Sequence, residues 1–323
     1  MLGCSFLQAR TWTSTDGKEI EAELVKVEGE IVVLSMRGKE YRVPLNKLSD
    51  EDREFAESWE GASKDEEAGS ADTEWELFGK VLKPGEVVEA ETDLDEKVAK
   101  ALSGNKLKPL KMKVKIELPA GFDPAKPQHV FWCVGGINNE DERKRGNIGT
   151  WGRGKVPSSK GWVVVSADTE HGNPRESTVQ LCEGDLEFHL QVIEELSKVF
   201  PDFKSWKHAC GGHSSGAKGS FFRIAQLLEA EATVVGGFFS GCNQCMGPMA
   251  AEEAGVRKSK FKPVKAYLST GDQDNLVPAS TIKRMEGDLK DAGFREIQSK
   301  IFPGGHVSSN EQFAEALDWF VAE

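Results

Sequence analysis

The chain has 323 residues, which suits two domains, one of them large enough for a sizeable hydrophobic core. Its net charge of −12 at pH 7 argues against a nucleic-acid partner and against adhesion to acidic membranes. No apolar run approaches the roughly 20 residues of a membrane-spanning helix, so the sequence predicts no transmembrane segment.

The first nine residues are mildly apolar and end in Leu7, Gln8 and Ala9, directly before Arg10. Such an ending is typical of a secretion signal, although this segment is short and has no basic start. We therefore interpret residues 1–9 as the remnant of a signal peptide and expect export to the periplasm or the extracellular space. A cytoplasmic location is the alternative.

Residues 10–43 alternate apolar and polar side chains over short stretches, which is typical of β-strands. A short helical stretch follows, at which Ser49 and Asp52 resemble a capping box. The sequence therefore predicts a small all-β unit over residues 10–58 that closes with a helix. Three dipeptides between its strands carry strong hairpin signals: Asp16-Gly17, Glu28-Gly29 and Arg37-Gly38.

Spaced single residues distinguish this unit: Arg10, Trp12, Thr13, Gly17, Ala22, Leu34, Gly38, Val43, Pro44, Leu45, Leu48, Ser49 and Asp52. With these residues, the stretch 10–58 resembles the Sla-one homology domain, an SH3-like barrel. Eukaryotic domains of this kind bind short peptide motifs, so the resemblance implies a peptide or protein ligand and a targeting or adaptor role. A purely structural appendage is the alternative.

Residues 60–76 are rich in Glu, Asp, Ala, Ser and Gly and poor in apolar residues. This composition is typical of a solvated linker. We expect a flexible acidic linker over residues 59–73, which lets the barrel move independently of a second domain at 74–323.

Strands alternate with helices in the second domain, and this alternation predicts a mostly parallel sheet that is covered on both faces. Residues 112–118 alternate polar and apolar side chains as an edge strand does. In open α/β sheets, ligands and catalytic groups collect at the carboxyl ends of the strands. Further strands are predicted at 129–134, 162–166, 206–211, 232–239, 264–268 and 296–302, and helices at 185–199, 217–230, 280–291 and 310–320.

Residues 212–216, Gly-His-Ser-Ser-Gly, fit the G-x-S-x-G pattern that presents a nucleophilic serine on a sharp turn between a strand and a helix. The predicted strand 206–211 precedes this turn, and the predicted helix 217–230 follows it. Ser214 is therefore the candidate nucleophile, at a helix N-terminus whose N–H groups favour a developing oxyanion. We expect His213 to pack behind the turn rather than act as the base, because adjacent side chains on a sharp turn diverge.

The acid and the base of a catalytic triad should follow the serine in that order along the chain. Asp274 lies in a turn after a predicted strand, and His306 ends the sequence Pro-Gly-Gly-His after the last predicted strand. Asp272 is the competing acid, since both carboxylates follow the same glycine, and the spacing to the next Val-Pro pair favours Asp274. His306 is the only histidine downstream of either acid.

With these three motifs in order, residues 74–323 resemble the α/β-hydrolase superfamily, in particular its branch of esterases, feruloyl esterases and polyhydroxybutyrate depolymerases. The resemblance implies an α/β-hydrolase fold with a mostly parallel central sheet. It also implies that Ser214 is the nucleophile, Asp274 the acid and His306 the base.

The oxyanion hole of such an enzyme requires two donors. One is expected from the backbone N–H of Ser215, the residue after the nucleophile. The other is expected from the backbone of Gly136, in the turn after the strand 129–134, with Ile137 as the second choice. Family members often carry His-Gly at this turn, whereas this chain has Val134 in place of the histidine.

We predict a serine hydrolase that cleaves carboxylic esters through an acyl-enzyme, with acylated polysaccharides or related polymers as one class of substrate. A serine peptidase of the same fold is the first alternative, and a catalytically inactive binding or adaptor protein is the second. The prediction includes no cofactor.

The cysteines predict no metal site. Cys242 and Cys245 form a C-x-x-C pair, but a zinc site would need a second close pair, which the sequence lacks. In an oxidising compartment, a disulfide between two of Cys182, Cys242 and Cys245 would brace the rim of the cleft.

Overall fold

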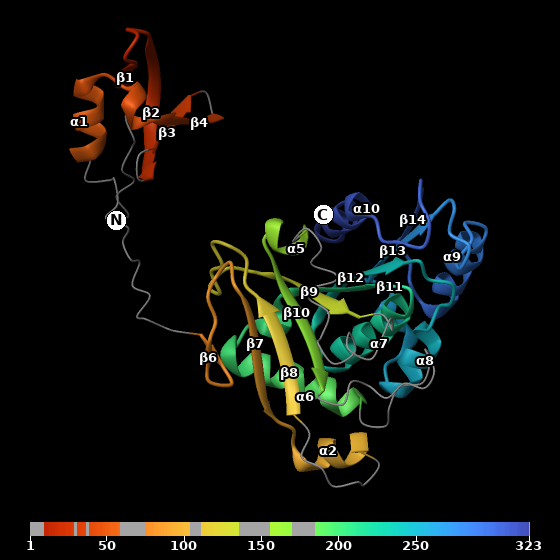
Figure 1. The fold of residues 1–323 in the computed structure, drawn as a ribbon. Coiled ribbons are helices and arrows are strands. Elements are labelled where there is room, and N and C mark those ends of the chain that lie inside the picture. The colour runs from red at the N-terminus through yellow and green to blue at the C-terminus, as the bar shows by residue number, and fades with distance from the viewer. Residues whose placement is uncertain are drawn as a thin grey trace. The chain divides into compact units, whose positions relative to one another are not determined.

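A computed structural model describes residues 10–28, 31–36, 39–58, 75–103, 111–135, 156–169 and 185–322 (Figure 1). The proposed signal remnant at 1–9 and the predicted linker lie outside the described residues. The chain divides into two compact units, Met1–Thr73 and Glu74–Glu323. Each unit is described by itself.

The N-terminal unit is a small antiparallel sheet followed by a helix. Its elements are β1 (Arg10–Thr13), β2 (Glu19–Glu28), β3 (Ile31–Met36), β4 (Lys39–Pro44), a 3-10 turn at Leu45–Lys47 and α1 (Asp50–Ser58), with the strands in sequential order. Gly17 has φ +75° in the turn that joins β1 to β2, where the sequence predicts a hairpin. Trp12 is buried in the core, and its indole N–H donates to the carbonyl of Ala22 at 3.1 Å. Ser49 caps α1 as predicted, since its hydroxyl accepts a hydrogen bond from the N–H of Asp52 at 3.3 Å.

The larger unit is built on an eight-stranded sheet. Its strands are β7 (Val87–Asp93), β8 (Lys111–Glu117), β9 (His129–Val134), β10 (Trp162–Thr169), β11 (Lys207–His213), β12 (Thr233–Ser240), β13 (Lys265–Gly271) and β14 (Ile297–Phe302). They lie in the order β14-β13-β12-β11-β9-β10-β8-β7, and β8 runs antiparallel to both of its neighbours while the other pairs are parallel. The strands β5 (Glu76–Leu77) and β6 (Lys80–Val81) form a separate two-stranded sheet. This is the α/β-hydrolase fold that the sequence predicts.

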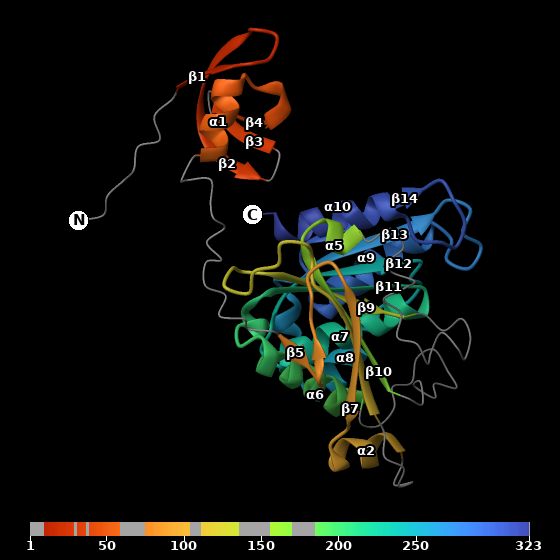
Figure 2. The same ribbon diagram turned by 60° about the vertical axis from the view of Figure 1, so that its left-hand side comes forward.

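Helices cover both faces of the large sheet, and each face has its own hydrophobic core (Figure 1, Figure 2). One core includes α6 (Asp185–Val199), α7 (Ser215–Glu229), α8 (Gly247–Glu253) and α9 (Thr281–Ala292), with α2 (Glu96–Ser103) beside α6, and the other includes α5 (Val156–Ser159) and α10 (Asn310–Val321). Phe238 and Phe239 are neighbours on β12 and belong to opposite cores, as the two-residue period of a strand requires. No helix within the described ranges is both long and apolar enough to cross a membrane.

The edge of the sheet differs from the sequence prediction. Residues 112–118 were expected as an edge strand, but β8, which contains most of them, pairs on its outer side with β7. The strand β7 has only one buried residue, Ala90, so its apolar pattern is too weak to identify a strand. Its pairing with β8 instead brings opposite charges together, such as Glu89 and Lys115 at 2.9 Å.

His208, on β11, is a fully buried histidine with both ring nitrogens hydrogen-bonded. Its Nδ1 accepts a hydrogen bond from the indole N–H of Trp132 at 3.1 Å, and its Nε2 donates to the carbonyl of Phe203 at 2.8 Å. Burial lowers the pKa of His208 from 6.5 to about 4, against the smaller opposing effect of the Phe203 carbonyl. The ring is therefore neutral in the folded protein near pH 7.

We expect the free energy of unfolding to fall as the pH drops from about 6.5 to about 4, because in this range the unfolded chain binds a proton that folded His208 excludes. The gap between the two pKa values is worth about 3 kcal/mol for this one group. Urea unfolding at a series of pH values would measure it. A His208→Gln variant keeps a donor and an acceptor without titrating, so its free energy of unfolding should depend less on pH than that of the parent. Equal slopes for the two proteins would contradict this role of His208.

Candidate active site

Ser214 occupies a strained turn between β11 and α7. Its φ of 58° and ψ of −118° are unusual for a residue with a side chain. Such strain persists only where the surroundings enforce it, and it often marks functional sites. The two flanking glycines are required by space, because a Cβ on Gly212 would lie 2.2 Å from the carbonyl carbon of Gly216. The G-x-S-x-G pattern thus corresponds to the sharp strand-to-helix turn that the sequence predicts.

The end of β9 lies against the start of α7. A Cβ on Gly216 would lie 2.3 Å from the carbonyl oxygen of Val134 and 2.9 Å from the carbonyl carbon of Gly135. The chain after β9 therefore leaves the sheet beside the N-terminus of α7. Ser215, one expected oxyanion donor, is the first residue of that helix and is buried. The other expected donor, Gly136, and its alternative Ile137 lie outside the described residues.

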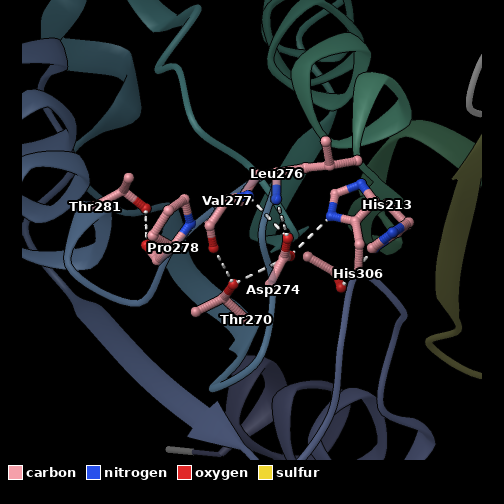
Figure 3. Close-up of polar contacts among 9 residues, drawn as sticks. His213, Thr270, Asp274, Leu276, Val277, Pro278, Thr281 and His306 are labelled. Carbon is pink, nitrogen blue, oxygen red and sulfur yellow. Dashed lines mark hydrogen bonds and ion pairs between the residues drawn. The ribbon is translucent and has the colours of Figure 1, made fainter.

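Asp274 and His306 lie next to each other, in the loops that follow β13 and β14 (Figure 3). His306 Nδ1 is 2.7 Å from Asp274 Oδ2, and the other carboxylate oxygen accepts hydrogen bonds from the N–H groups of Leu276 at 2.9 Å and Val277 at 2.8 Å. The carboxylate is thus fixed by the backbone of its own loop and oriented toward the imidazole. The second ring nitrogen, His306 Nε2, is buried and has no hydrogen-bond partner in the described part of the chain.

Asp274 is held in its ionised form. Burial would raise its pKa, but the hydrogen bonds from the Val277 N–H, the His306 ring and the Leu276 N–H outweigh burial and lower the pKa below its ordinary value. A buried carboxylate of this kind can stabilise a positive charge that develops on the adjacent imidazole during catalysis.

The competing carboxylate, Asp272, has a different set of contacts. Its Oδ1 accepts a hydrogen bond from the N–H of Gly304 at 3.0 Å, and its own N–H donates to the carbonyl of Phe302 at 2.8 Å. Asp272 therefore ties the loop after β13 to the loop after β14. Asp274 thus contacts the imidazole of His306, whereas Asp272 contacts the backbone of the loop that contains His306.

His213 packs directly on His306. The ring centroids are 4.4 Å apart, and His213 Nδ1 is 3.0 Å from the hydroxyl of Ser240. Burial and the nearby His306 lower the pKa of His213 to about 4, so it is neutral near pH 7. Our expectation that His213 would pack behind the turn did not include this contact, because the sequence does not indicate that the loop after β14 reaches the end of β11.

Gly241, directly after β12, packs against the rings of His213 and His306. Its φ is +53°, and a Cβ at this position would lie 2.7 Å from His213 Cε1 and 3.0 Å from His306 Cε1. Only glycine leaves room for the two rings to pack there. Sequence reasoning did not single out Gly241, although a glycine at the carboxyl end of a buried strand is the signal that could have identified it.

Ser214 comes to the same edge of the sheet as the His306–Asp274 pair, because its neighbour His213 contacts the His306 ring. No hydrogen bond joins the hydroxyl of Ser214 to His306 Nε2, since that nitrogen has no partner within the described ranges. Catalytic hydrogen bonds are often long or poorly aligned before substrate binds.

The cysteines near this edge are free thiols. Burial raises the pKa of Cys242 to about 11 and that of Cys245 to about 12, so neither is a reactive thiolate at neutral pH. Neither takes part in a disulfide, and the third cysteine considered, Cys182, lies outside the described residues. No group of three or more His, Cys, Asp or Glu side chains that could hold a metal ion occurs in the ranges that the structure covers.

Comparison with known proteins supports the assignment of the N-terminal unit. Residues 5–64 match the family model of SLA1 homology domain 1, SHD1. The chain therefore begins with an SHD1 domain, which confirms the resemblance found in the sequence. A search among curated proteins found no match.

Solved structures similar to the chain include hydrolases. A carboxylesterase from Bacillus cereus has 15% identity, with 70% of this chain and 98% of that chain covered and a TM-score of 0.43. The S-formylglutathione hydrolase FrmB from Staphylococcus aureus has 13% identity, with coverage of 74% and 100% and a TM-score of 0.46. An esterase from Pyrococcus furiosus has 14% identity, with coverage of 75% and 97% and a TM-score of 0.46. At these identities and TM-scores, the similarity indicates nothing about the substrate.

Proposed function

We propose that the larger unit is a serine hydrolase that cleaves carboxylic esters, with Ser214 as its nucleophile. The observation that carries the proposal is the 2.7 Å contact between His306 Nδ1 and Asp274 Oδ2. This bond places the ring proton on Nδ1 and leaves the lone pair of Nε2 available to accept a proton. A neutral imidazole held in this way by a buried carboxylate is the general base that a serine nucleophile requires.

In the proposed reaction, His306 Nε2 takes the proton of the Ser214 hydroxyl while the serine oxygen attacks the ester carbonyl. Asp274 stabilises the resulting imidazolium and does not itself take up the proton. The tetrahedral intermediate then releases the alcohol, which receives the proton from His306. Water activated by the same imidazole attacks the acyl-enzyme in the second half of the cycle and releases the acid.

The oxyanion of the tetrahedral intermediate develops at the N-terminus of α7. In the proposal, the N–H of Ser215 donates one hydrogen bond to it, and the backbone of Gly136, after β9, donates the other. The contact of Gly216 with the last residues of β9 supports this arrangement, because it brings the two chain segments together beside the nucleophile. Loss of one such donor typically lowers kcat by about a hundredfold to a thousandfold.

A fluorophosphonate probe and short-chain aryl esters test this function. We expect the full chain to hydrolyse the esters and to be labelled at Ser214, as mass spectrometry of the labelled peptide would show. Ser214→Ala should lose both activities while keeping the unfolding transition of the parent. A parent protein that neither hydrolyses nor labels would instead support the inactive binding protein, and faster cleavage of peptides than of esters would support a peptidase.

The substrate class can be narrowed by a second assay. We propose acylated polysaccharides or related polymers as substrates, and acetylated, feruloylated and hydroxyalkanoate esters represent the main acyl types. The acyl group with the highest kcat/KM defines the acyl pocket. Equal kcat/KM values for all three types would contradict a dedicated acyl pocket.

A further inference from the structure

Lys218 is a cation close to the proposed nucleophile, and it has no partner among the described residues. It lies in the first turn of α7, and its backbone N–H is 3.4 Å from the carbonyl oxygen of Ser214. Its side chain is half-buried and has neither an ion pair nor a hydrogen bond in the described part of the chain. The other half-buried lysines in those ranges are all partnered: Lys111 and Lys113 with Glu91, Lys115 with Glu89, and Lys265 with the carbonyl oxygens of Trp319 and Ala322.

Helix geometry directs the side chain of Lys218 toward the N-terminus of α7. In an α-helix each Cα–Cβ bond tilts toward the N-terminus, so a side chain covers the turn that precedes it. For Lys218 that preceding turn begins at Ser214. Ser214 lies directly before α7, and its carbonyl oxygen is 3.4 Å from the backbone N–H of Lys218. A lysine side chain carries its ammonium group on four methylene groups, so it is long enough to reach the surroundings of the serine hydroxyl.

The loop after β12 supports this placement. Burial raises the pKa of the Cys242 thiol, whereas the hydrogen bond with the Gln244 backbone and, to a smaller extent, the positive charges of Lys218 and Arg284 lower it, as expected of cations in the vicinity of the sulfur. Cys242 directly follows Gly241, the residue that packs against the rings of His213 and His306. The charge of Lys218 is therefore close to the same edge of the sheet as the proposed triad.

The neighbouring cation, Arg284 on α9, already has a counterion and a hydrogen-bond acceptor. Its guanidinium donates to the carbonyl of Asn243 at 2.7 Å and pairs with Asp288 at 3.1 Å. A half-buried charge without a counterion loses hydration with no compensating interaction. Among the residues that the structure covers, none gives Lys218 the compensation that Arg284 has, and an anionic ligand would supply it.

We propose that Lys218 binds a carboxylate carried by the substrate, so that the enzyme prefers esters of acidic compounds. This inference rests on the proposed ester hydrolysis and names the class of ester. The carboxylate would lie a few bonds from the scissile carbonyl, since Lys218 is about one helical turn from Ser214. Half-esters of dicarboxylic acids have this geometry.

Two aryl esters of similar length test the proposal: p-nitrophenyl butyrate, which is neutral, and p-nitrophenyl hemisuccinate, which carries a carboxylate. The measured quantity is the ratio of kcat/KM for the hemisuccinate to kcat/KM for the butyrate. We expect Lys218→Met to lower this ratio about tenfold or more, chiefly through KM, because a hydrogen bond to a charged group is lost. Lys218→Arg should restore most of the ratio, since it restores the charge.

Lys204→Met is the matched control. Lys204 is exposed and precedes β11, at the opposite end of that strand from Ser214, so its loss should leave the ratio unchanged. If Lys218→Met lowers the rates for both esters by the same factor, the preference for acidic esters is wrong while ester hydrolysis stands. If the parent hydrolyses neither ester, both proposals are overturned.

Discussion

Asp274→Asn is expected to lower kcat for ester hydrolysis by about ten-thousandfold, the usual effect of replacing the acid of a Ser-His-Asp triad by its amide. An asparagine at this position can still accept the hydrogen bonds from Leu276 and Val277. Its NH₂ group, however, would donate to His306 Nδ1 and move the ring proton to Nε2. The imidazole could then no longer accept the proton of Ser214.

Asp272→Asn is the matched control for that variant. Asp272 is two residues away and contacts the backbone of Gly304, an interaction that an asparagine oxygen can keep. We therefore expect this variant to retain most of the activity. Steady-state kinetics on an aryl ester, with urea unfolding of each variant, separates a catalytic effect from a folding defect. If Asp272→Asn were the inactive variant, the assignment of the acid would be wrong.

The strand-to-helix turn at Ser214 could be predicted from sequence because the strand, the G-x-S-x-G turn and the helix follow one another directly along the chain. A Cβ on either flanking glycine would collide with backbone atoms. Glycine at both positions therefore indicates that two backbone segments lie close together there. The spacing between Asp274 and the following Val-Pro pair was also informative. It corresponds to the hydrogen bond from the N–H of Val277 that fixes the carboxylate.

The edge strand β7 could not be predicted, for a physical reason. The burial of β7 alternates, but its inward positions are Val88, Ala90 and Thr92, and only Ala90 is buried. The strand therefore lacks the strongly apolar inward face that identifies a half-buried strand in a sequence. Pairing with β8 stabilises β7 through ion pairs, including the contact of Glu91 with Lys111 at 2.6 Å. That contact depends on the register between β7 and β8. The seven residues of β7 alone do not indicate this register.

The layer of His213, Gly241 and His306 was also beyond sequence reasoning. His213 is the last residue of β11, Gly241 directly follows β12 and His306 lies in the loop after β14, and each lies at least 28 positions from the next along the chain. Their contact depends on which strands are neighbours in the sheet, and strand order is a property of the whole fold. The Gly304-Gly305-His306 turn therefore indicated His306 as a candidate base but did not indicate the ring that packs on it.

His306→Ala is expected to lower kcat by about 10⁴-fold or more, because it removes the proposed general base. The adjacent imidazole of His213 cannot replace it, although the two rings are only 4.4 Å apart. His213 has its Nδ1 bound to the hydroxyl of Ser240, and no carboxylate within the described ranges is hydrogen-bonded to its ring. Its pKa of about 4 also makes it a weak acceptor of the serine proton.

His213→Phe is the matched variant that separates the two rings. A phenyl ring keeps the packing on His306 and Gly241 but loses the hydrogen bond to Ser240. We expect it to retain kcat within about tenfold, since a ring that only positions the base has no proton to transfer. Its profile of kcat/KM between pH 5 and pH 8 should keep the shape of the parent profile, because His213 is already neutral over that range. A His213→Phe variant as inactive as His306→Ala, with an unchanged unfolding transition, would show that His213 takes part in proton transfer.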